Sequence, residues 1–199
     1  HCGGNFGLSL KRAGYDACII TGKAERPTTV HITEDAVTFE DASDLWGLLI
    51  SETQEKLPKD TDKLVIGPAG ENRVLYSCVF SGERTSGRGG VGAVFGDKNL
   101  KAVTVKGTKK CEIAHPEKLK KLNRKWVRTL QTHPLTGRQL PKLGTAGLIA
   151  PMHAHGILAT KNFGAGRFDR FEAVSGEELA EKHLVSNAAC STCVIRCAR

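Results

Sequence analysis

Three cysteines stand close together near the C-terminal end of this 199-residue chain, at Cys190, Cys193 and Cys197. Their spacing is C-x2-C-x3-C. Thiolates are soft ligands that suit zinc and iron–sulfur clusters. Structural zinc is usually held by pairs of cysteines or of cysteine and histidine, whereas one short run completed by a distant cysteine is typical of a cubane cluster. The run favours an iron–sulfur cluster, with zinc as the alternative; enzymes that cleave S-adenosylmethionine have the two inner spacings reversed.

The remaining features of the cysteines agree with a metal site. We expect the fourth ligand to lie beyond Arg199, and Arg196 and Arg199 either offset the cluster's negative charge or are exposed surface arginines. A disulfide framework belongs to short secreted chains and would not crowd three thiols in this way. The clustering, in a chain without a secretory signal, favours a reducing compartment, so we expect the cytoplasm. Four scattered cysteines are not expected to bind the cluster: Cys2, Cys18, Cys78 and Cys111.

A second group of residues is rich in glycine. Gly87, Gly89 and Gly92 spell G-x-G-x-x-G, the dinucleotide-binding pattern, which requires a strand before it and a helix directly after it. Because a strand is expected from Ala102, the chain after Gly92 leaves no room for a crossover helix. The sequence therefore disfavours a nicotinamide site.

The same loop still suggests phosphate binding. Backbone N–H groups approach an anion closely where side chains are absent, and arginines give paired donors to its oxygens. Arg84 and Arg88 stand among these glycines, and Gly3–Gly4 and Gly67–Gly70 offer similar loops. The alternative is a set of tight turns in a β-rich domain.

The net charge is +8, and basic residues concentrate between Lys109 and Arg128. A basic balance can indicate nucleic acid, an anionic cofactor or an acidic protein. Aromatic residues make up 6% of the chain and do not interleave with this stretch, which weakens a platform for single strands. A solvated helix face is the simpler interpretation, and we expect no nucleic-acid partner.

Periodicity divides the chain into two parts, and the expected fold class is α+β. Residues 1–107 form a strand-rich part, and residues 108–199 begin a helical part. The first part is expected to hold strands at 17–21, 28–33, 36–40, 63–66, 74–80 and 102–105, with Cys18 and Cys78 buried in two of them, and a helix over 41–57. The second part is expected to hold a helix over 115–132 and another opened by a Ser175/Glu178 capping box. No apolar run approaches the roughly 18 residues of a membrane span, and both ends read as cut from a longer polypeptide.

The segment GRGGVGAVFGDKNLKAV at 87–103 strongly resembles the glycine-rich signature of the tungsten-containing aldehyde ferredoxin oxidoreductase family. Further matches follow in the family's order along almost the whole chain: GGNFG at 3–7, KRAGYDACIITGKAERP at 11–27, IGPAGEN at 66–72, LPKLGTA at 140–146, KNF at 161–163 and CSTCVIRC at 190–197. The resemblance implies a β-rich base under the cofactor, followed by helical domains.

The resemblance also implies the cofactors: tungsten (molybdenum in some relatives) held by two pterins, beside a [4Fe–4S] cluster. The residues that match those holding the pterin phosphates are Gly3, Gly4, Arg84, Thr85, Gly87, Arg88, Gly89 and Gly90. Backbone carbonyls at His1 and Thr85 match the ligands of a bridging magnesium ion, and Cys190, Cys193 and Cys197 match the first three cluster ligands. The fourth cysteine, the acid–base residues and an arginine that links pterin to cluster match nothing here, so this segment alone is catalytically incomplete.

The implied activity is oxidation of an aldehyde to a carboxylic acid, with electrons leaving through the cluster to ferredoxin or an iron–sulfur electron-transfer subunit. Two alternatives stay open at this point. One is a related tungsten-dependent reductase of aromatic acyl-CoA thioesters, and the other is a non-catalytic iron–sulfur or zinc module. The catalytic residues, the particular aldehyde and the oligomeric state, a homo-oligomer included, are not given by the sequence.

Overall fold

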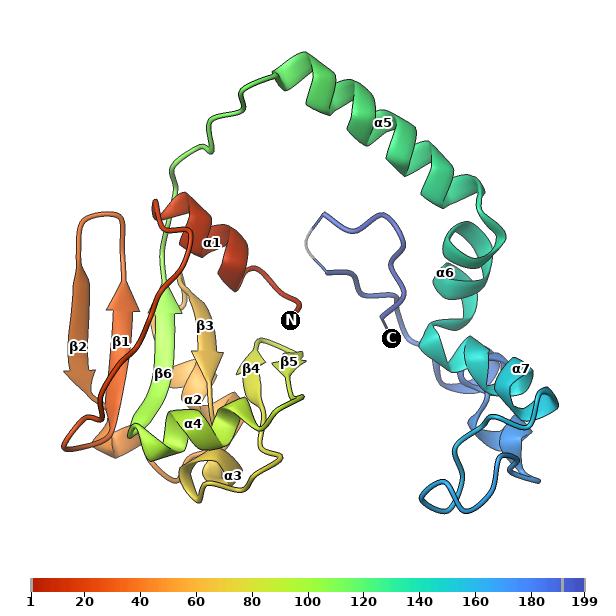
Figure 1. The fold of residues 1–199 in the computed structure, drawn as a ribbon, viewed down its shortest axis with the longest axis horizontal. Coiled ribbons are helices and arrows are strands. Elements are labelled where there is room, and N and C mark those ends of the chain that lie inside the picture. Colours follow the sequence, from red (N-terminus) through yellow and green to blue (C-terminus); the bar gives the residue numbers. More distant parts are fainter. Residues whose placement is uncertain (1, 191, 199) are drawn as a thin grey trace. The chain divides into compact units, whose positions relative to one another are not determined.

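The computed structural model describes residues 2–190 and 192–198, and its contacts divide the chain into two compact units, His1–Glu112 and Ile113–Arg199. Unit 1 carries the strands, and unit 2 is built from helices and turns (Figure 1). The α+β fold class predicted from the sequence is confirmed. No helix in the described part of the chain is long and apolar enough to cross a membrane.

Unit 1 is organised around one mixed sheet (Figure 1). Its strands are β1 (Thr28–Ile32), β2 (Val37–Asp41), β3 (Asp62–Val65), β4 (Val79–Ser81), β5 (Arg84–Ser86) and β6 (Leu100–Val105). The order across the sheet is β2-β1-β6-β3-β4-β5. β1 and β6 are parallel and the other neighbours are antiparallel. Every residue of β6 is buried, as expected for a central strand covered on both faces.

Helices cover both faces of this sheet. On one face Val30, Ile32, Val103 and Val105 pack with side chains from α1 (Phe6–Arg12) and with Phe95 of α4 (Val91–Asp97). On the other face the buried Val65 and Ala102 pack against Leu57 and against Ile50, the first residue of α2 (Ile50–Lys56). Successive side chains of a strand point to opposite faces of the sheet, which is why Val103 and Val105 lie in one core cluster and Ala102 in the other.

The helices α3 (Pro68–Glu71) and α4 (Val91–Asp97) pack backbone to backbone through glycines. A Cβ atom on Gly96 would lie 1.9 Å from the Gly70 carbonyl oxygen, and one on Gly70 would lie 3.0 Å from the Gly92 carbonyl oxygen. There is therefore no space for a methyl group at Gly96 and little at Gly70. The glycines of IGPAGEN and of the 87–96 segment thus serve partly to bring these two short helices together.

We expect Gly96→Ala to destabilise unit 1 by about 1–3 kcal/mol, because the added methyl group forces α3 and α4 apart. Gly7→Ala is the matched control. Gly7 is helical like Gly96, but it is exposed, and a Cβ atom there would meet nothing within 4 Å. Urea unfolding of the two variants measures the difference. Equal midpoints for both would contradict the packing role of Gly96.

Three predicted elements of unit 1 are wrong or too long. Residues 17–21 form no strand: Ile20 packs on the sheet core, while Ile19 is 87% exposed. The helix expected over 41–57 begins only at Ile50, because Asp41 ends β2 and Gly47, at φ +88, interrupts the helical path. The strand expected over 74–80 is limited to Val79–Ser81.

A buried ion pair joins α3 to the central strand. Lys101 of β6 has no exposed side-chain surface, and its Nζ lies 2.5 Å from Oε1 of Glu71, whose side chain is 4% exposed. Lys101 also donates to the Leu48 carbonyl oxygen at 3.0 Å, and the Gly47 N–H donates to Glu71 at 2.8 Å. Both charges are therefore paired and further hydrogen-bonded, as buried charges must be.

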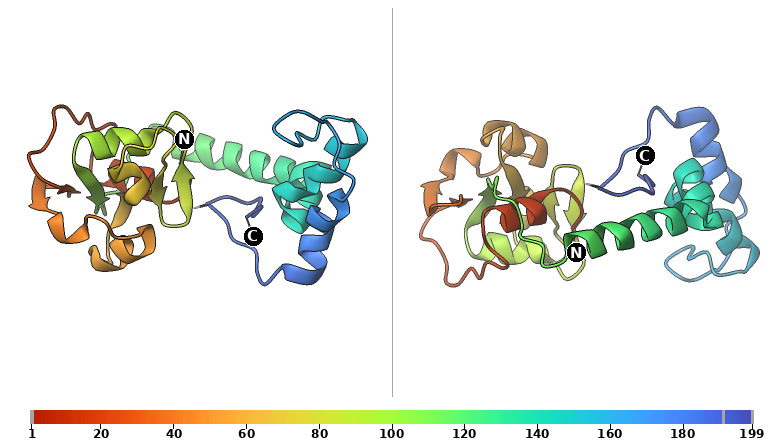
Figure 2. Two further views of the ribbon diagram at one scale, coloured as in Figure 1. Left: turned by 90° about the horizontal axis from the view of Figure 1, so that it is seen from below. Right: turned by 90° about the horizontal axis from the view of Figure 1, so that it is seen from above.

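Unit 2 opens with α5 (Pro116–Thr132), a long straight helix (Figure 2). The helix predicted over 115–132 is confirmed to within one residue at its start. The shorter helical segments that follow are Pro134–Gln139, α6 (Leu140–Leu143), Thr145–Leu148, α7 (Ile149–Ala154), Phe171–Val174, α8 (Gly176–Glu178) and Leu179–His183. The Ser175 hydroxyl accepts from the Glu178 N–H, so half of the predicted capping box forms; the Glu178 carboxylate pairs with Lys182 instead.

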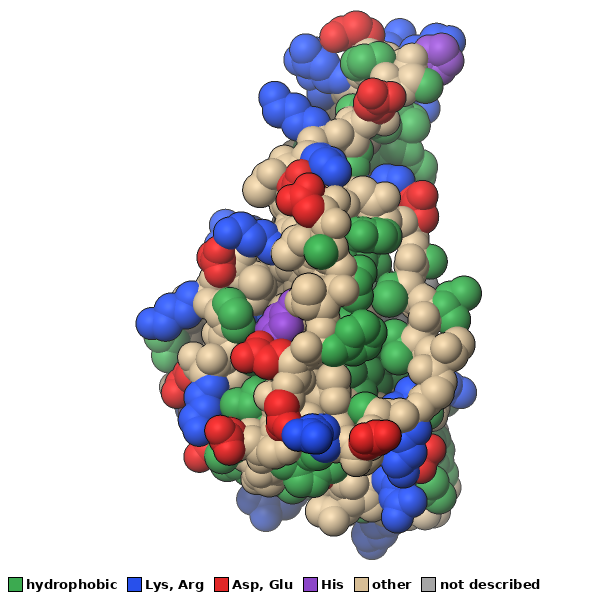
Figure 3. All heavy atoms as spheres, turned by 90° about the vertical axis from the view of Figure 1, so that its left-hand side faces the viewer, with side chains coloured by type: hydrophobic (Ala, Val, Ile, Leu, Met, Phe, Trp, Pro, Cys, Tyr) green, Lys and Arg blue, Asp and Glu red, His purple; other side chains and the backbone are tan. Residues whose placement is uncertain are grey.

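The side of unit 1 formed by the edge strand β2 carries an apolar furrow (Figure 3). This cavity of about 370 Å³ lies between residues 20–24 and the strands β1 and β2, and Phe39, 73% exposed, is at its rim. It is separate from the residues that the sequence singles out for chemistry.

Candidate functional site

The N-terminal glycines lie against the β4–β5 hairpin. Gly4 has φ +92, and a Cβ atom on it would lie 2.9 Å from the Ser81 hydroxyl oxygen. Ser81 is the register partner of Arg84 in β5. The structure therefore brings Gly3 and Gly4 to the hairpin that carries Arg84 and Thr85, although almost 80 residues separate the two segments.

The loop after β5 leaves two backbone donors without acceptors. In the described part of the chain, the N–H groups of Arg88 and Gly89 make no hydrogen bond, and Gly89, exposed at φ +90, would present a Cβ atom to open space. The side chains of Arg84 and Arg88 likewise have no ion-pair partner among the described residues. Adjacent N–H donors beside unpaired arginines form a site that suits a phosphate group.

The glycines of this loop divide into two classes. Gly90 and Gly92 are needed for packing, since Cβ atoms on them would lie 1.9 Å from the Leu75 carbonyl oxygen and 2.7 Å from the Ser77 hydroxyl oxygen. Gly87 and Gly89 face no backbone, and Gly87 meets only the Cys78 sulfur at 3.0 Å. Of Gly4, Gly87, Gly89 and Gly90, Gly89 is the one at which a Cβ atom would meet nothing within 4 Å, so its φ of +90 is not explained by packing.

One expectation about this loop is wrong: a helix, α4, does follow it, between Gly90 and β6. The dinucleotide pattern is nevertheless not built. β5 lies at the edge of the sheet, three strands away from β6 and antiparallel to it through β4 and β3. The pattern requires a parallel βαβ unit with adjacent strands, and this topology does not provide one.

Of the two backbone carbonyl groups that match magnesium ligands, the structure describes the one at Thr85. Thr85 is the central residue of β5, exposed and paired with Phe80. His1 lies outside the described residues. The magnesium assignment therefore stays a prediction.

The cysteine run forms a loop that is closed at its base. The Ala188 N–H donates to the Ala198 carbonyl oxygen at 3.0 Å, so the chain returns to itself around Cys190, Cys193 and Cys197. Within the loop the Cys193 N–H donates to the Cys190 carbonyl oxygen at 3.1 Å. All three thiols are free; Cys190 is exposed and the other two are half-buried.

The donor chemistry of this loop fits an iron–sulfur cluster, because it offers three unpaired soft ligands on one short closed segment. No three His, Cys, Asp or Glu side chains converge on a metal-sized site in the described part of the chain. Arg196 donates to the Asn187 carbonyl oxygen at 3.4 Å, and Asn187 donates to the Pro141 carbonyl oxygen at 2.9 Å. Arg196 thus braces the loop, and Arg199 lies outside the described residues.

The loop is accompanied by a helix that sequence reasoning did not connect with it. A cavity of about 360 Å³ is lined by Asn123, Trp126, Val127 and Leu130 of α5 and by residues 192–195 of the loop, including Cys193. The signal was present in the sequence, since Trp126 and Leu130 belong to the apolar stripe of α5. The stripe shows that one side of the helix packs, but not against which segment.

The other four cysteines lie away from this loop in sequence, and the burial expected for two of them is not observed. Cys18 is exposed in an irregular segment, and Cys78 is half-buried just before β4. Cys2 adjoins the glycine loop, and the partial burial of its thiol raises its pKa, an effect that a hydrogen bond from the Ser81 backbone opposes. A raised pKa keeps this thiol protonated near neutral pH.

Residues 1–107 match the family described as aldehyde ferredoxin oxidoreductase, N-terminal domain, and residues 121–199 match aldehyde ferredoxin oxidoreductase, domains 2 and 3. The chain belongs to the aldehyde ferredoxin oxidoreductase family. The resemblance predicted from the motifs is confirmed. The relatives named for this family are oxidoreductases.

The relatives cover this chain well but extend far beyond it. The chain is 45% identical over 203 residues to the tungsten-containing aldehyde ferredoxin oxidoreductase of Pyrococcus horikoshii, covering 99% of this chain and 33% of that protein. It is 38% identical over 144 residues to the aliphatic sulfonate oxidoreductase, WOR-like subunit, of Pyrococcus furiosus, covering 63% and 23%. Among solved structures, a chain of the active site complex BamBC of benzoyl coenzyme A reductase, in complex with 1,5-dienoyl-CoA, matches with a TM-score of 0.76 and 31% identity, covering 98% and 32%. The chain thus spans about a third of the length of the aldehyde ferredoxin oxidoreductase and of the benzoyl coenzyme A reductase chain, and less than a quarter of the WOR-like subunit.

Proposed function

We propose that the protein containing this chain oxidises an aldehyde to a carboxylic acid and passes the electrons through a [4Fe–4S] cluster to ferredoxin or a similar acceptor. One aldehyde and one water give one carboxylic acid, two protons and two electrons, and two one-electron acceptors take those electrons in turn. The observation that carries the proposal is that one chain of this family holds both a glycine loop with two unpaired backbone N–H groups and a closed loop of three thiols.

The chain's own residues would act by binding and positioning. The N–H groups of Arg88 and Gly89, with Arg84, would hold a pterin phosphate, and the carbonyl of Thr85 would contribute to a magnesium site. Cys190, Cys193 and Cys197 would bind three corners of the cluster. When bound, tungsten (or molybdenum) and its pterins supply oxygen transfer and Lewis-acid chemistry, and the cluster supplies one-electron transfer.

Metal and activity analysis tests this proposal. The protein, purified without oxygen, should contain tungsten or molybdenum, pterin, iron and sulfide, and should reduce benzyl viologen when given an aldehyde. Zinc as the sole metal, without pterin, would contradict the proposal and favour a non-catalytic module.

A second function is supported by the likeness to the benzoyl coenzyme A reductase complex. In that case the tungsten site would reduce an aromatic acyl-CoA thioester. Assays with an aldehyde and with benzoyl-CoA plus a low-potential donor separate the two: turnover with the thioester alone would replace the first proposal by the second.

The glycine loop offers a direct test of cofactor binding. We expect Gly89→Val to lower the pterin content severalfold, because a β-branched residue at φ +90 costs about 1–3 kcal/mol and reshapes the two N–H donors. Iron content should persist, since the thiols belong to unit 2. Arg88→Ala should lower pterin content less, because it removes one cation and keeps the loop shape.

Gly22→Val is the matched control for this test. Gly22 also has a positive φ, +71, and a Cβ atom on it would meet nothing within 4 Å, but it lies before β1. A similar loss of pterin in both glycine variants would mean that strain in unit 1, and not the loop itself, lowers the pterin content.

A further inference from the structure

We infer that Lys120, Arg124 and Arg128 of α5 form a docking surface for an acidic electron-carrier protein, beside the loop that carries Cys193. This inference rests on the proposed function and adds to it the surface through which electrons leave. We call these three residues the basic row.

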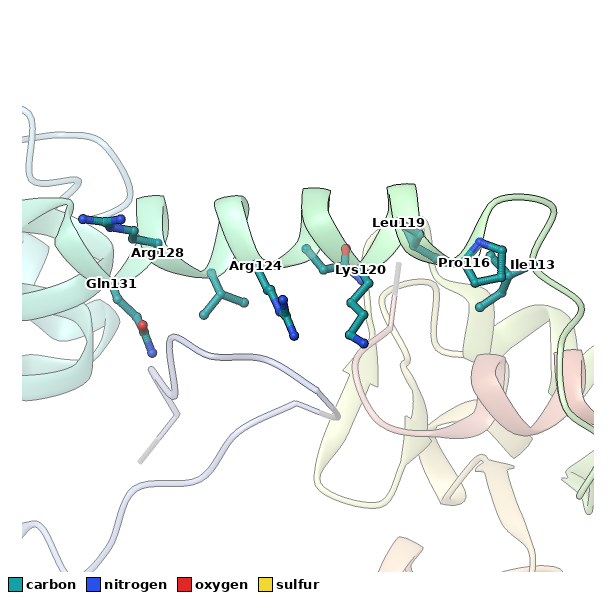
Figure 4. A pocket seen from close by; sticks show the side chains of 9 residues that line it. Ile113, Pro116, Leu119, Lys120, Arg124, Arg128 and Gln131 are labelled. Atoms are coloured by element: carbon teal, nitrogen blue, oxygen red, sulfur yellow. The ribbon is translucent and has the colours of Figure 1, made fainter.

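The basic row lies along one flank of α5. Its members are four residues apart, so they follow one another on the same side of the helix. They line a groove of about 530 Å³ together with Asn123, Val127 and other α5 residues, and Figure 4 shows Lys120 and Arg124 pointing to the same side. All three are exposed, and none has an ion-pair or hydrogen-bond partner for its side chain among the described residues. A row of unpaired cations attracts an anionic partner without having to break an existing pair.

The row borders the cysteine loop. Asn123 and Val127 line the groove of the basic row and also the cavity that Cys193 lines. The basic row and the cysteine loop therefore both lie beside Asn123 and Val127 of α5, within unit 2. One-electron transfer falls steeply with distance, so a carrier held at this flank would stand where it can receive an electron from the cluster.

The chemistry of the surface favours an acidic protein over nucleic acid. Charge complementarity steers a partner to its site and raises the association rate. Nucleic acid would add stacking of bases on several aromatic rings, but α5 carries a single aromatic residue, Trp126, which is 57% exposed and lines the cavity at the cysteine loop.

The same helix provides a control of equal charge. Lys118, Lys121 and Lys125 are also exposed but line neither the groove of the basic row nor the cavity at Cys193. Reversal of three charges on either flank changes the net charge by the same amount, so a general loss of positive charge affects both variants alike.

The experiment compares K120E/R124E/R128E with K118E/K121E/K125E in the whole enzyme, with an acidic ferredoxin or benzyl viologen as acceptor. With the row variant we expect kcat/KM for ferredoxin to fall about tenfold or more at low ionic strength, because KM rises. Added salt should reduce the difference in kcat/KM between this variant and the unchanged enzyme, because it screens the charges. The control variant should keep its ferredoxin kinetics. Viologen reduction by the row variant should match the unchanged enzyme, which separates failure of docking from failure of the proposed activity.

Several outcomes would overturn the inference. Equal losses in the two variants would assign the effect to net charge. A loss with viologen, or a shifted midpoint potential of the cluster with unchanged ferredoxin KM, would assign the row to the cluster itself. Row-dependent binding of a single-stranded oligonucleotide with unchanged ferredoxin kinetics would assign it to nucleic acid. If the reversed variant fails to fold, K120Q/R124Q/R128Q should still raise the ferredoxin KM, and an unchanged KM there would also end the inference.

Discussion

Replacement of Cys193 by alanine is expected to remove most of the iron and sulfide from the protein. Cys193 is the middle cysteine of the run, its N–H closes a turn onto Cys190, and its neighbours line the cavity against α5. A methyl group has no lone pair to offer iron, and two remaining thiols of this loop hold a cubane poorly. The measurement is iron and sulfide per protein after reconstitution without oxygen, with the visible absorption of the cluster.

Cys111→Ala is the control for this experiment, because Cys111 is exposed and is not part of the loop. It should leave iron and sulfide unchanged. Full iron content in the Cys193 variant would show that the ligands have been assigned wrongly, and loss of iron in the Cys111 variant would show that another thiol takes part.

The second large effect is expected at the buried ion pair. Lys101→Met should lower the apparent free energy of unfolding by about 3–5 kcal/mol, because it leaves the Glu71 carboxylate buried without its cation. The double change Lys101→Met with Glu71→Met should recover much of this loss, since no uncompensated charge remains. Urea unfolding of the single and double variants measures both values.

A surface pair gives the comparison. Lys106 and Asp60 also form an ion pair, but their side chains are 51% and 63% exposed, so Lys106→Met should cost far less than Lys101→Met, because solvent screens an exposed pair. If the single Lys101 change costs no more than the Lys106 change, the buried pair does not hold α3 to β6.

Local periodicity predicts the regular elements of this fold and misses its tertiary pairings. β1, β2 and α5 are readable because alternation and helical spacing are properties of neighbouring residues. Residues 17–21 have the composition of a strand, yet they pair with no strand of the sheet: Ile20 packs on the sheet core while Ile19 is exposed. Lys101 would be expected at the surface from its charge, and only the approach of α3 explains its burial.

The candidate site divides in the same way. The cysteine run predicts metal binding because its three candidate ligands are close together in the sequence. The role of each glycine cannot be predicted from its sequence neighbours, because the carbonyl oxygens that exclude a side chain at Gly90 and Gly96 come from residues 75 and 70. Which glycines serve a ligand and which serve packing depends on those distant approaches, and Trp126 joins the cysteine loop for the same kind of reason.

The hydrogen bond between Ala188 and Ala198 has a consequence for how a cluster would be assembled. A chelating loop normally loses conformational entropy when its ligands close around the metal. Here the backbone hydrogen bond joins the two ends of the loop, so part of that entropy is lost through the fold of unit 2. The affinity of the three thiols for iron therefore depends on the integrity of unit 2, and a substitution that opens the base of the loop weakens metal binding without touching a single sulfur.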